Sequence, residues 1–385
     1  MDFRLSEEQQ QIRDMVHDLC LERVQPRAAA IDESGEFPWD IKELFKKHDI
    51  LAIPFTHEYG GVSGSAVTLI LAVEEISKFC ATSSLILSVQ SLGSLPIWLA
   101  GTDEQKRKYL PPLARGEQLA AYALTEPGSG SDAGGMRTRA IRHGDTYVIN
   151  GSKTFITGGS VADTIVVFAR TDQDGQGAAR NISAFVVEKT MPGFKVGKLE
   201  KKLGIRGSPT AQLFFEDLAV PAANRLGNEN DGFKLAMRVL DHSRPGIAAQ
   251  ALGIAEGAFD LARRYALERH QFGKAIAEFQ GIQFMLADMA TQIEAARALT
   301  YAAGDAIDRN LADINVSSAM AKVCASDTAM RVTTDAVQIL GGYGYLRDFP
   351  AERMMRDAKI TQIYEGTNEI QRLVIARGTL KETRP

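Results

Sequence analysis

Thr146-Tyr147-Val148-Ile149 opens a series of short β-branched and aromatic runs that decides the fold, followed by Ile165-Val166-Val167-Phe168, Ala184-Phe185-Val186-Val187 and Gln212-Leu213-Phe214-Phe215. Gly and Asp residues separate these runs, as is typical of strands joined by turns. Asn150-Gly151 follows the first run and favours a type I′ turn, whose two central positions need positive φ. The sequence therefore predicts a β domain with a hairpin turn at residues 150–151.

The region before these runs, from the start to about Leu119, has a helical pattern. Ser6 with Gln9, and Thr102 with Gln105, have the spacing of capping boxes that begin helices. After the first box, apolar residues recur at helical spacing: Ile12, Met15, Val16, Leu19 and Cys20. The period changes near Tyr122, so we expect an N-terminal helical domain over residues 1–120.

The helical period returns after about Asn228 and holds to the end. One long apolar stripe is rich in Ala, which permits close helix approach in a bundle: Ala248, Ala251, Leu252, Ala255, Phe259, Ala262 and Ala266. The predicted fold class is α+β, with a middle antiparallel β domain over 121–228 and a C-terminal four-helix-bundle domain over 229–385.

Composition places this 385-residue chain among ordinary globular proteins, with 45% hydrophobic and 24% charged residues. A net charge of -4 gives no basic excess and argues against nucleic acid as a ligand. The cysteines Cys20, Cys80 and Cys324 lie far apart, so neither disulfides nor a metal site is expected. We see no signal or transit peptide and expect the apolar stretches to stop well short of a membrane span, so a cytoplasmic protein is expected.

Several polar or Gly-rich segments could carry chemistry. Thr125 to Asp132 is a loop of small residues that lets backbone N–H groups approach a ligand, although such clusters are also typical of surface turns. Lys153 to Gly158 offers an aromatic face and a hydroxyl near the same edge. Arg269 to Gly273 and Gln338 to Gly344 interrupt helical regions, and ordinary helix ends explain them equally well.

Tyr364-Glu365-Gly366-Thr367 precedes the apolar positions of a final helix. Thr367 is the expected N-cap, and Glu365 lies on the loop just before it. The Glu365 carboxylate could face a pocket, or it could only complement the helix dipole.

Together these segments resemble the acyl-CoA dehydrogenase family from about Phe3 to Ala376. The resemblance rests on four motifs in the family's order: Ala123 to Asp132, Asp288-Met289-Ala290, Gln338 to Gly344, and Arg356-Asp357-Ala358-Lys359-Ile360 through Thr367. It implies an FAD enzyme that desaturates an acyl-CoA thioester, with Glu365 as the base that removes the α proton. Burial beside an acyl chain should raise the pKa of Glu365 toward the operating pH.

The resemblance also implies the ligand contacts. The residues expected at FAD are Tyr122, Leu124, Thr125, Gly130, Ser131, Phe155, Ile156, Thr157, Arg269, Phe272, Gln280, Gln338, Ile339, Gly341, Gly342, Thr367 and Glu369. The residues expected at the substrate are Ser131, Asp241, Ser243, Arg244, Gly366 and Arg377. Arg269, Phe272 and residues 338–342 match positions that reach FAD across a subunit interface, so a dimer is the minimum unit and a tetramer is usual in the family.

Two departures concern the pockets. Phe155 stands where many members have Trp, which keeps an aromatic wall without an indole N–H. Ser84, Ser88 and Gln90 lie on the helix that resembles the floor of the acyl pocket, and they match no single chain length.

Several readings stay open. Electrons are expected to pass to an electron-transfer flavoprotein, and the alternatives are a dehydrogenase of branched, alicyclic or aromatic acyl-CoA, or an oxygen-reducing relative. A non-catalytic flavin or CoA scaffold, or a purely structural bundle, fits an intact Glu365 motif and the β insertion less well. A mitochondrial matrix location would require a transit peptide removed from the mature chain.

Overall fold

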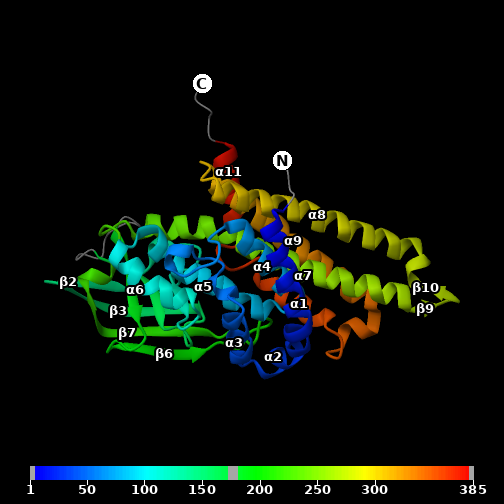
Figure 1. Ribbon diagram of the computed structural model, residues 1–385, viewed down its shortest axis with the longest axis horizontal. Helices are drawn as coiled ribbons and strands as arrows, with labels where there is room; N and C mark the ends of the chain where they lie inside the picture. Colours follow the sequence, from blue (N-terminus) through cyan, green and yellow to red (C-terminus); the bar gives the residue numbers. More distant parts are fainter. Residues whose placement is uncertain (1–4, 172–180, 381–385) are drawn as a thin grey trace.

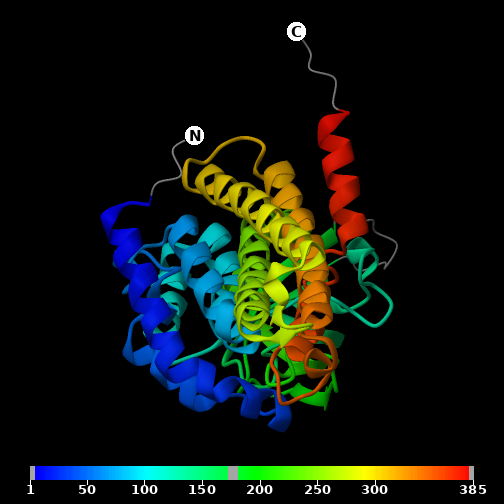
Figure 2. The ribbon, with the colours of Figure 1, turned by 90° about the vertical axis from the view of Figure 1, so that its right-hand side faces the viewer.

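The computed structural model describes residues 5–171 and 181–380, so Phe3, where the resemblance begins, lies outside it. Figure 1 shows an elongated molecule in which the sheet occupies one end and long helices run toward the other. The N-terminal helices lie against both parts, and α11 stands out from the body (Figures 1 and 2).

The N-terminal part is helical, as predicted. Its helices are α1 (Glu7–Leu19), α2 (Ala28–Ser34), α3 (Trp39–Lys47), α4 (Ala66–Phe79), α5 (Ala81–Ala100) and α6 (Asp103–Ala114). Both capping boxes are present, at Ser6 and at Thr102. Val16 and Cys20 of the apolar pattern in α1 and the turn after it are buried, whereas Met15 of the same pattern is 39% exposed.

Helix α5 is 20 residues long and uncharged, and it is the helix in the described chain that is apolar and long enough to cross a membrane. The sequence prediction that apolar stretches stop well short of this length was therefore wrong for residues 81–100. More than half of this window, 56%, is buried inside the protein. The helix packs on α7 and on the first strand of the sheet, which is the position of a core helix.

The middle part forms one sheet, in the order β6-β7-β3-β2-β4-β5-β8, with β1 added on β4. Its strands are β1 (Ala120–Ala123), β2 (Arg139–His143), β3 (Thr146–Thr157), β4 (Thr164–Arg170), β5 (Ile182–Glu188), β6 (Phe194–Leu199), β7 (Thr210–Pro221) and β8 (Arg225–Leu226). All four runs identified in the sequence lie in strands. The pairings are antiparallel except that β1 and β2 run parallel to β4.

The predicted hairpin at Asn150-Gly151 is wrong. Strand β3 continues through this pair to Thr157, and the register on β7 shifts between Ile149 and Gly151, as in a β-bulge. Gly151 has a φ of 145°, and a Cβ there would lie 2.6 Å from the Thr138 hydroxyl. The β2–β3 turn instead uses Gly144, which has a φ of 61°. Positive φ was therefore predicted correctly at Gly151, where it serves a bulge, and wrongly at Asn150.

The C-terminal part packs α7 (Gly232–Glu268), α8 (Gln280–Asp308) and α9 (Ile314–Leu340) with α10 (Ala351–Ile360), and α11 (Asn368–Thr379) lies on α9. Figure 1 shows α7 extending from the sheet to the small β9–β10 ribbon (His270–Gln271 and Lys274–Ala275) at the far end. The predicted Ala stripe of α7 is buried, with Phe259 partly so. Small side chains let α7 and α9 approach closely over their length.

Helix α10 is tied to both other parts of the chain. The Asp357 carboxylate accepts a hydrogen bond from the Ile205 backbone N–H at 2.5 Å. The neighbouring Arg356 bonds Asp32 of α2 at 2.6 Å and Glu352 within α10. The loop that follows α10 therefore starts from a fixed point.

Candidate active site

The loop between α10 and α11 holds Glu365 in an uncommon backbone conformation. Its φ is 52°, and that of Gly366 is 91°, so two successive residues lie in the left-handed region. Thr367 caps α11 by accepting from the Ile370 N–H, as the sequence predicted. The loop is thus bounded by a clamped helix and a capped one.

The Glu365 side chain faces the middle of α7. Ser243 donates its hydroxyl to Glu365 Oε2 at 2.6 Å. Arg244 donates from Nε to the Glu365 carbonyl at 3.3 Å, and its other end bonds Asp241 at 2.7 Å. The structure therefore brings Asp241, Ser243 and Arg244 together with Glu365, although they are 121 or more positions apart.

Burial raises the pKa of Glu365 above its usual value, and the Ser243 hydrogen bond, Arg244 and Lys322 oppose part of that rise. Tyr122 of β1 lies close enough to Glu365 and Arg244 for both charges to affect the pKa of its phenol. Burial, together with Glu365, raises its pKa well above the ordinary range. A carboxylate whose pKa is raised, beside a half-buried phenol, is a stronger base than an exposed glutamate.

A second layer behind Glu365 was not identified from the sequence. Lys322 of α9 donates to the Gly366 carbonyl at 2.9 Å and to Asn368 Oδ1 at 2.8 Å. Gln371 donates from its amide to the carbonyls of Glu365 and Gly366 at 3.2 and 3.0 Å. One signal was available, since Lys322 shares a helical face with Ala325 and Ala329, where an exposed lysine would not be expected.

The predicted cofactor segments on the β domain lie side by side. Thr154 donates its backbone N–H to the Thr125 carbonyl at 2.9 Å. The fully buried Lys153 bonds the Leu124 carbonyl at 2.9 Å and Glu126 Oε1 at 2.8 Å. Glu126 also accepts from two backbone N–H groups, at Arg137 and Thr138. Residues 124–129 are therefore fastened to β3 immediately before Phe155.

The surface formed there leaves room for a planar ligand. Phe155 has a φ of 57° and is 64% exposed, although it is a large apolar side chain. Gly130 and Ser131 are exposed, and a Cβ at Gly130 would meet no atom within 4 Å. Ile156 is buried beneath this surface and Thr157 is half-buried.

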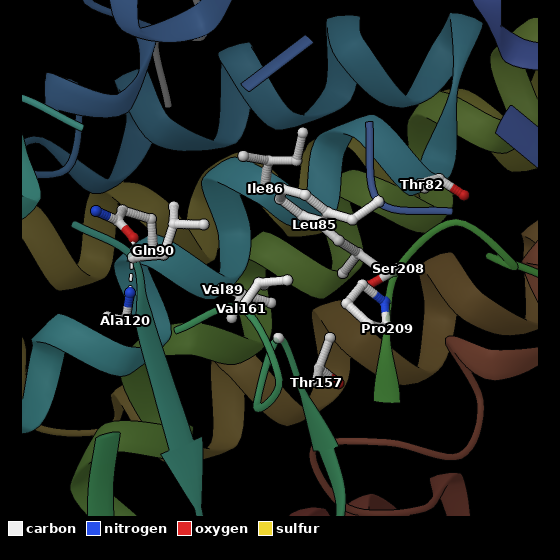
Figure 3. Close-up of a pocket in the computed structure, with 13 residues that line it drawn as sticks. Thr82, Leu85, Ile86, Val89, Gln90, Ala120, Thr157, Val161, Ser208 and Pro209 are labelled. Carbon is white, nitrogen blue, oxygen red and sulfur yellow. Dashed lines mark hydrogen bonds between the residues drawn. The ribbon is translucent and has the colours of Figure 1, made fainter. Parts of the chain in front are cut away.

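A pocket lies between α5 and the turn after β3, and Thr157 is at its rim (Figure 3). Leu85, Ile86 and Val89 give it an apolar wall. Of the three polar residues predicted at the acyl floor, only Gln90 lines this pocket. The Gln90 side-chain amide donates to the Leu113 and Gln118 carbonyls, and its oxygen accepts a hydrogen bond from the Ala120 backbone N–H. Gln90 therefore fixes the start of β1.

The hydroxyls of Ser84 and Ser88 also form hydrogen bonds within the protein. Ser84 donates to Ala81 and accepts from Gln250, and Ser88 donates to the Ser84 carbonyl. The same Gln250 accepts from the Tyr364 hydroxyl next to Glu365.

The remaining cofactor residues form a separate group at the far end of the molecule. An open hollow is lined by Arg269, Ile339, Gly341, Gly342 and Tyr343, among others. The Arg269 guanidinium lies 5.7 Å from the centre of the Tyr343 ring, and Gly341 ends α9 with a φ of 58°. Phe272 follows Gln271, which lines this hollow, and is 94% exposed. Gln280 begins α8, and Gln338 lies in the last turn of α9.

The structure does not bring this far group to Glu365 within one chain, which is the arrangement expected if the two belong to sites completed by different subunits. Arg377 and Glu369 are exposed on α11, and Arg377 lies in its last turn, so Arg377 is also not brought to Glu365. Their roles stay predictions.

The near group has the features that a flavin-dependent α-proton removal needs. It combines a carboxylate with a raised pKa, a small-residue loop with open space above it, and an exposed aromatic held at positive φ. The far hollow presents a guanidinium and two glycines, a donor set suited to a dinucleotide's phosphate and adenosine. The residues present therefore fit FAD.

Comparison with known proteins gives three domain matches. The acyl-CoA dehydrogenase N-terminal, middle and C-terminal domains match residues 6–117, 121–218 and 230–380. A Clostridium acetobutylicum protein named acyl-CoA dehydrogenase, short-chain specific, is 52% identical over 98% of this chain and 99% of its own length.

Two solved structures share the whole fold. Butyryl-CoA dehydrogenase from Megasphaera elsdenii has a TM-score of 0.96 at 47% identity, covering 99% of this chain and 100% of its own. A chain solved in work on the electron transferring flavoprotein of Acidaminococcus fermentans has a TM-score of 0.96 at 49% identity, with the same coverage.

Proposed function

The chain belongs to the acyl-CoA dehydrogenase family, and from this premise we propose that it desaturates a short straight-chain acyl-CoA to the 2-enoyl-CoA. The names of the similar proteins, short-chain acyl-CoA dehydrogenase and butyryl-CoA dehydrogenase, support the reaction and the short chain. We propose FAD as the cofactor and Glu365 as the catalytic base.

The observation that carries this proposal is the environment of the Glu365 carboxylate. Burial raises its pKa while Ser243 holds one oxygen at 2.6 Å, so the other oxygen is free to accept a proton from a fixed direction. An α C–H is a weak acid unless donors polarise the thioester carbonyl as enolate character develops. The backbone N–H of Glu365 is our candidate for one of those donors.

The other residues of the chain orient the substrate and exclude water. The Tyr122 ring lies near Glu365 and helps to remove water from the reacting carbons. Arg244 and Asp241 fix the base through its backbone. When bound, FAD supplies a hydride acceptor for the β carbon.

We propose that the two residue groups are completed by FAD shared between subunits, so that a dimer is the minimum functional unit and a tetramer the usual one. The neighbour solved in work on an electron transferring flavoprotein supports such a protein as the electron acceptor. Bacterial relatives support a cytoplasmic location. We also retain domain boundaries near residues 120 and 228.

The test is an anaerobic titration of the purified enzyme with straight-chain, branched and alicyclic acyl-CoAs while the flavin absorbance is recorded. We expect butyryl-CoA to bleach the wild type and the Glu58→Gln control, whose glutamate is exposed on the N-terminal part. Glu365→Gln should bind the thioester and stay oxidised.

Three other outcomes have defined meanings. A protein that carries no flavin, or is bleached by no thioester, contradicts the proposed function. Bleaching only by branched or alicyclic thioesters replaces the substrate class. Rapid reoxidation in air would identify an oxidase instead.

A further inference from the structure

Lys322 is a buried lysine whose ammonium group is aimed at the backbone of the Glu365 loop. Its side chain is 0% exposed and comes from α9. The Nζ atom lies 2.9 Å from the Gly366 carbonyl and 2.8 Å from Asn368 Oδ1. A buried charge is costly to keep, so its position calls for a reason beyond packing.

The contacts of Lys322 complete a set of donors around the two successive peptide groups that follow Glu365. Gln371 donates to both the Glu365 and the Gly366 carbonyls, and Arg244 donates to the Glu365 carbonyl from α7. Two successive carbonyls in the left-handed region are thus held from three helices. Such a conformation persists only where its surroundings over-determine it, and the donors of Lys322, Gln371 and Arg244 do so here.

The ammonium group also belongs to the electrostatic environment of the base. The charged groups that face Lys322 are Glu365 on the loop, Arg244 on α7, Asp327 on α9 and Glu369 on α11. Asp327 already bonds Asn368, Gln362 and Arg372, so its charge is shared with other partners. Burial lowers the pKa of Lys322 to about 8, and Glu365 opposes that fall.

We propose that Lys322 is a positioning residue for proton abstraction: by holding the Gly366 carbonyl it fixes the 366–367 peptide plane next to the base, and its charge holds the Glu365 carboxylate in the proton-accepting form. This rests on the proposed role of Glu365. The fixed peptide limits the backbone rotation of the loop that carries the base, and the cation offsets part of the rise that burial causes in the Glu365 pKa.

Three variants separate the two contributions of Lys322. Lys322→Met removes both the donor and the charge, Lys322→Gln keeps a neutral donor, and Lys322→Arg keeps the charge. Lys42→Met is the matched control, because Lys42 is a buried lysine of α3 that pairs with Glu43 away from the site. Circular dichroism and flavin content establish which variants fold.

The main readout uses 3-thiabutyryl-CoA, whose α C–H can break while its β position, a sulfur, has no hydride to give. The α proton moves to Glu365, the C–H electron pair becomes the enolate, and the long-wavelength band of the enolate beside oxidised flavin reports it. The pH midpoint of this band therefore measures proton transfer without turnover. The second readout is kcat and KM for butyryl-CoA.

We expect the midpoint to rise by about one pH unit in Lys322→Met and Lys322→Gln, since the loss of a nearby cation raises a carboxyl pKa. We expect kcat to fall on the order of 10- to 100-fold in Lys322→Met, with KM little changed, and to recover partly in Lys322→Gln. Lys322→Arg and Lys42→Met should keep the wild-type midpoint.

The proposal is overturned if Lys322→Gln folds, holds flavin and keeps both the wild-type midpoint and kcat. If Lys322→Met does not fold, Lys322→Gln and Lys322→Arg carry the same test. Failure of the proposed function looks different, because wild-type enzyme would then form no enolate band at any pH.

Discussion

Replacement of Lys153 by Met is the sharpest test of how the β domain holds its ligand-binding loop. Lys153 is fully buried, and the Glu126 carboxylate beside it is 7% exposed. Burial lowers the pKa of Lys153 to about 8. Burial acts to raise the pKa of Glu126, but Lys153 and the backbone donors outweigh it and the pKa lies below its usual value. Both groups are therefore charged at neutral pH.

The magnitude follows from what the substitution leaves behind. Removing one partner of a buried ion pair costs roughly 3–5 kcal/mol, because the other charge stays buried. Glu126 keeps its two backbone N–H donors, which places the expected loss of unfolding free energy near the lower limit, about 3 kcal/mol. In the double variant Glu126→Gln/Lys153→Met no unpaired charge remains, so the loss should be smaller than in Lys153→Met alone.

Urea unfolding at fixed protein and FAD concentrations measures these differences, since bound FAD shifts the apparent stability. Lys195→Met is the control, because Lys195 pairs with Glu216 on the same sheet but both side chains are more than 60% exposed. Its effect should stay within about 0.5 kcal/mol. A loss below about 1 kcal/mol in Lys153→Met, or a double variant less stable than the single one, would refute the reasoning.

Three further predictions concern the base, the bulge and α10. Ser243→Ala removes a hydrogen-bond donor to the Glu365 carboxylate, and this loss raises the pKa of Glu365. The acidic limb of the plot of kcat/KM against pH should therefore move to higher pH, and an unmoved limb would contradict the contact. Gly151→Ala should lower the free energy of unfolding, measured in urea, by about 2 kcal/mol or more, because the added Cβ meets Thr138 and positive φ adds strain. Gly144→Ala, which also has positive φ but open space around it, should lower it by about 1 kcal/mol. Burial raises the pKa of Asp357 to about 6, so the stability that its protonation contributes is present below about pH 4 and is lost as the pH rises through 6. Asp357→Asn should therefore be more stable than wild type by on the order of 2 kcal/mol at pH 8 and no more stable at pH 4. Equal effects at both pH values would exclude this cause.

Local pattern determined most of the architecture. The helical and strand runs, both capping boxes, the Thr367 cap and the Ala stripe of α7 all follow from periodicity and short-range chemistry, which depend on neighbours within a few residues. Where the same local signal suited two structures, pattern alone failed. A positive φ at Gly151 suits a turn and a bulge alike, and only the pairing of β3 with β7 decides between them.

The candidate site was predicted as segments rather than as an arrangement. The motif around Glu365 could be identified from its order in the chain, but its contact with Ser243 joins residues 122 positions apart. Lys322 gave only a faint signal, a lysine on an alanine-rich helical face. No short-range rule states which buried cation will face which carbonyl.

The sequence by itself therefore determined where helices and strands form, where the β part is inserted, and which loop carries the candidate base, because each depends on local propensity and hydrophobic period. Only the tertiary structure decided that Glu365 meets Ser243 and Arg244 on one side and Lys322 behind, and that Lys153 fastens the loop at 124–129 to β3. Those contacts depend on the packing of α7, α9 and the sheet. Burial there removes water, shifts the pKa values and leaves each charged group dependent on the partner that the fold supplies.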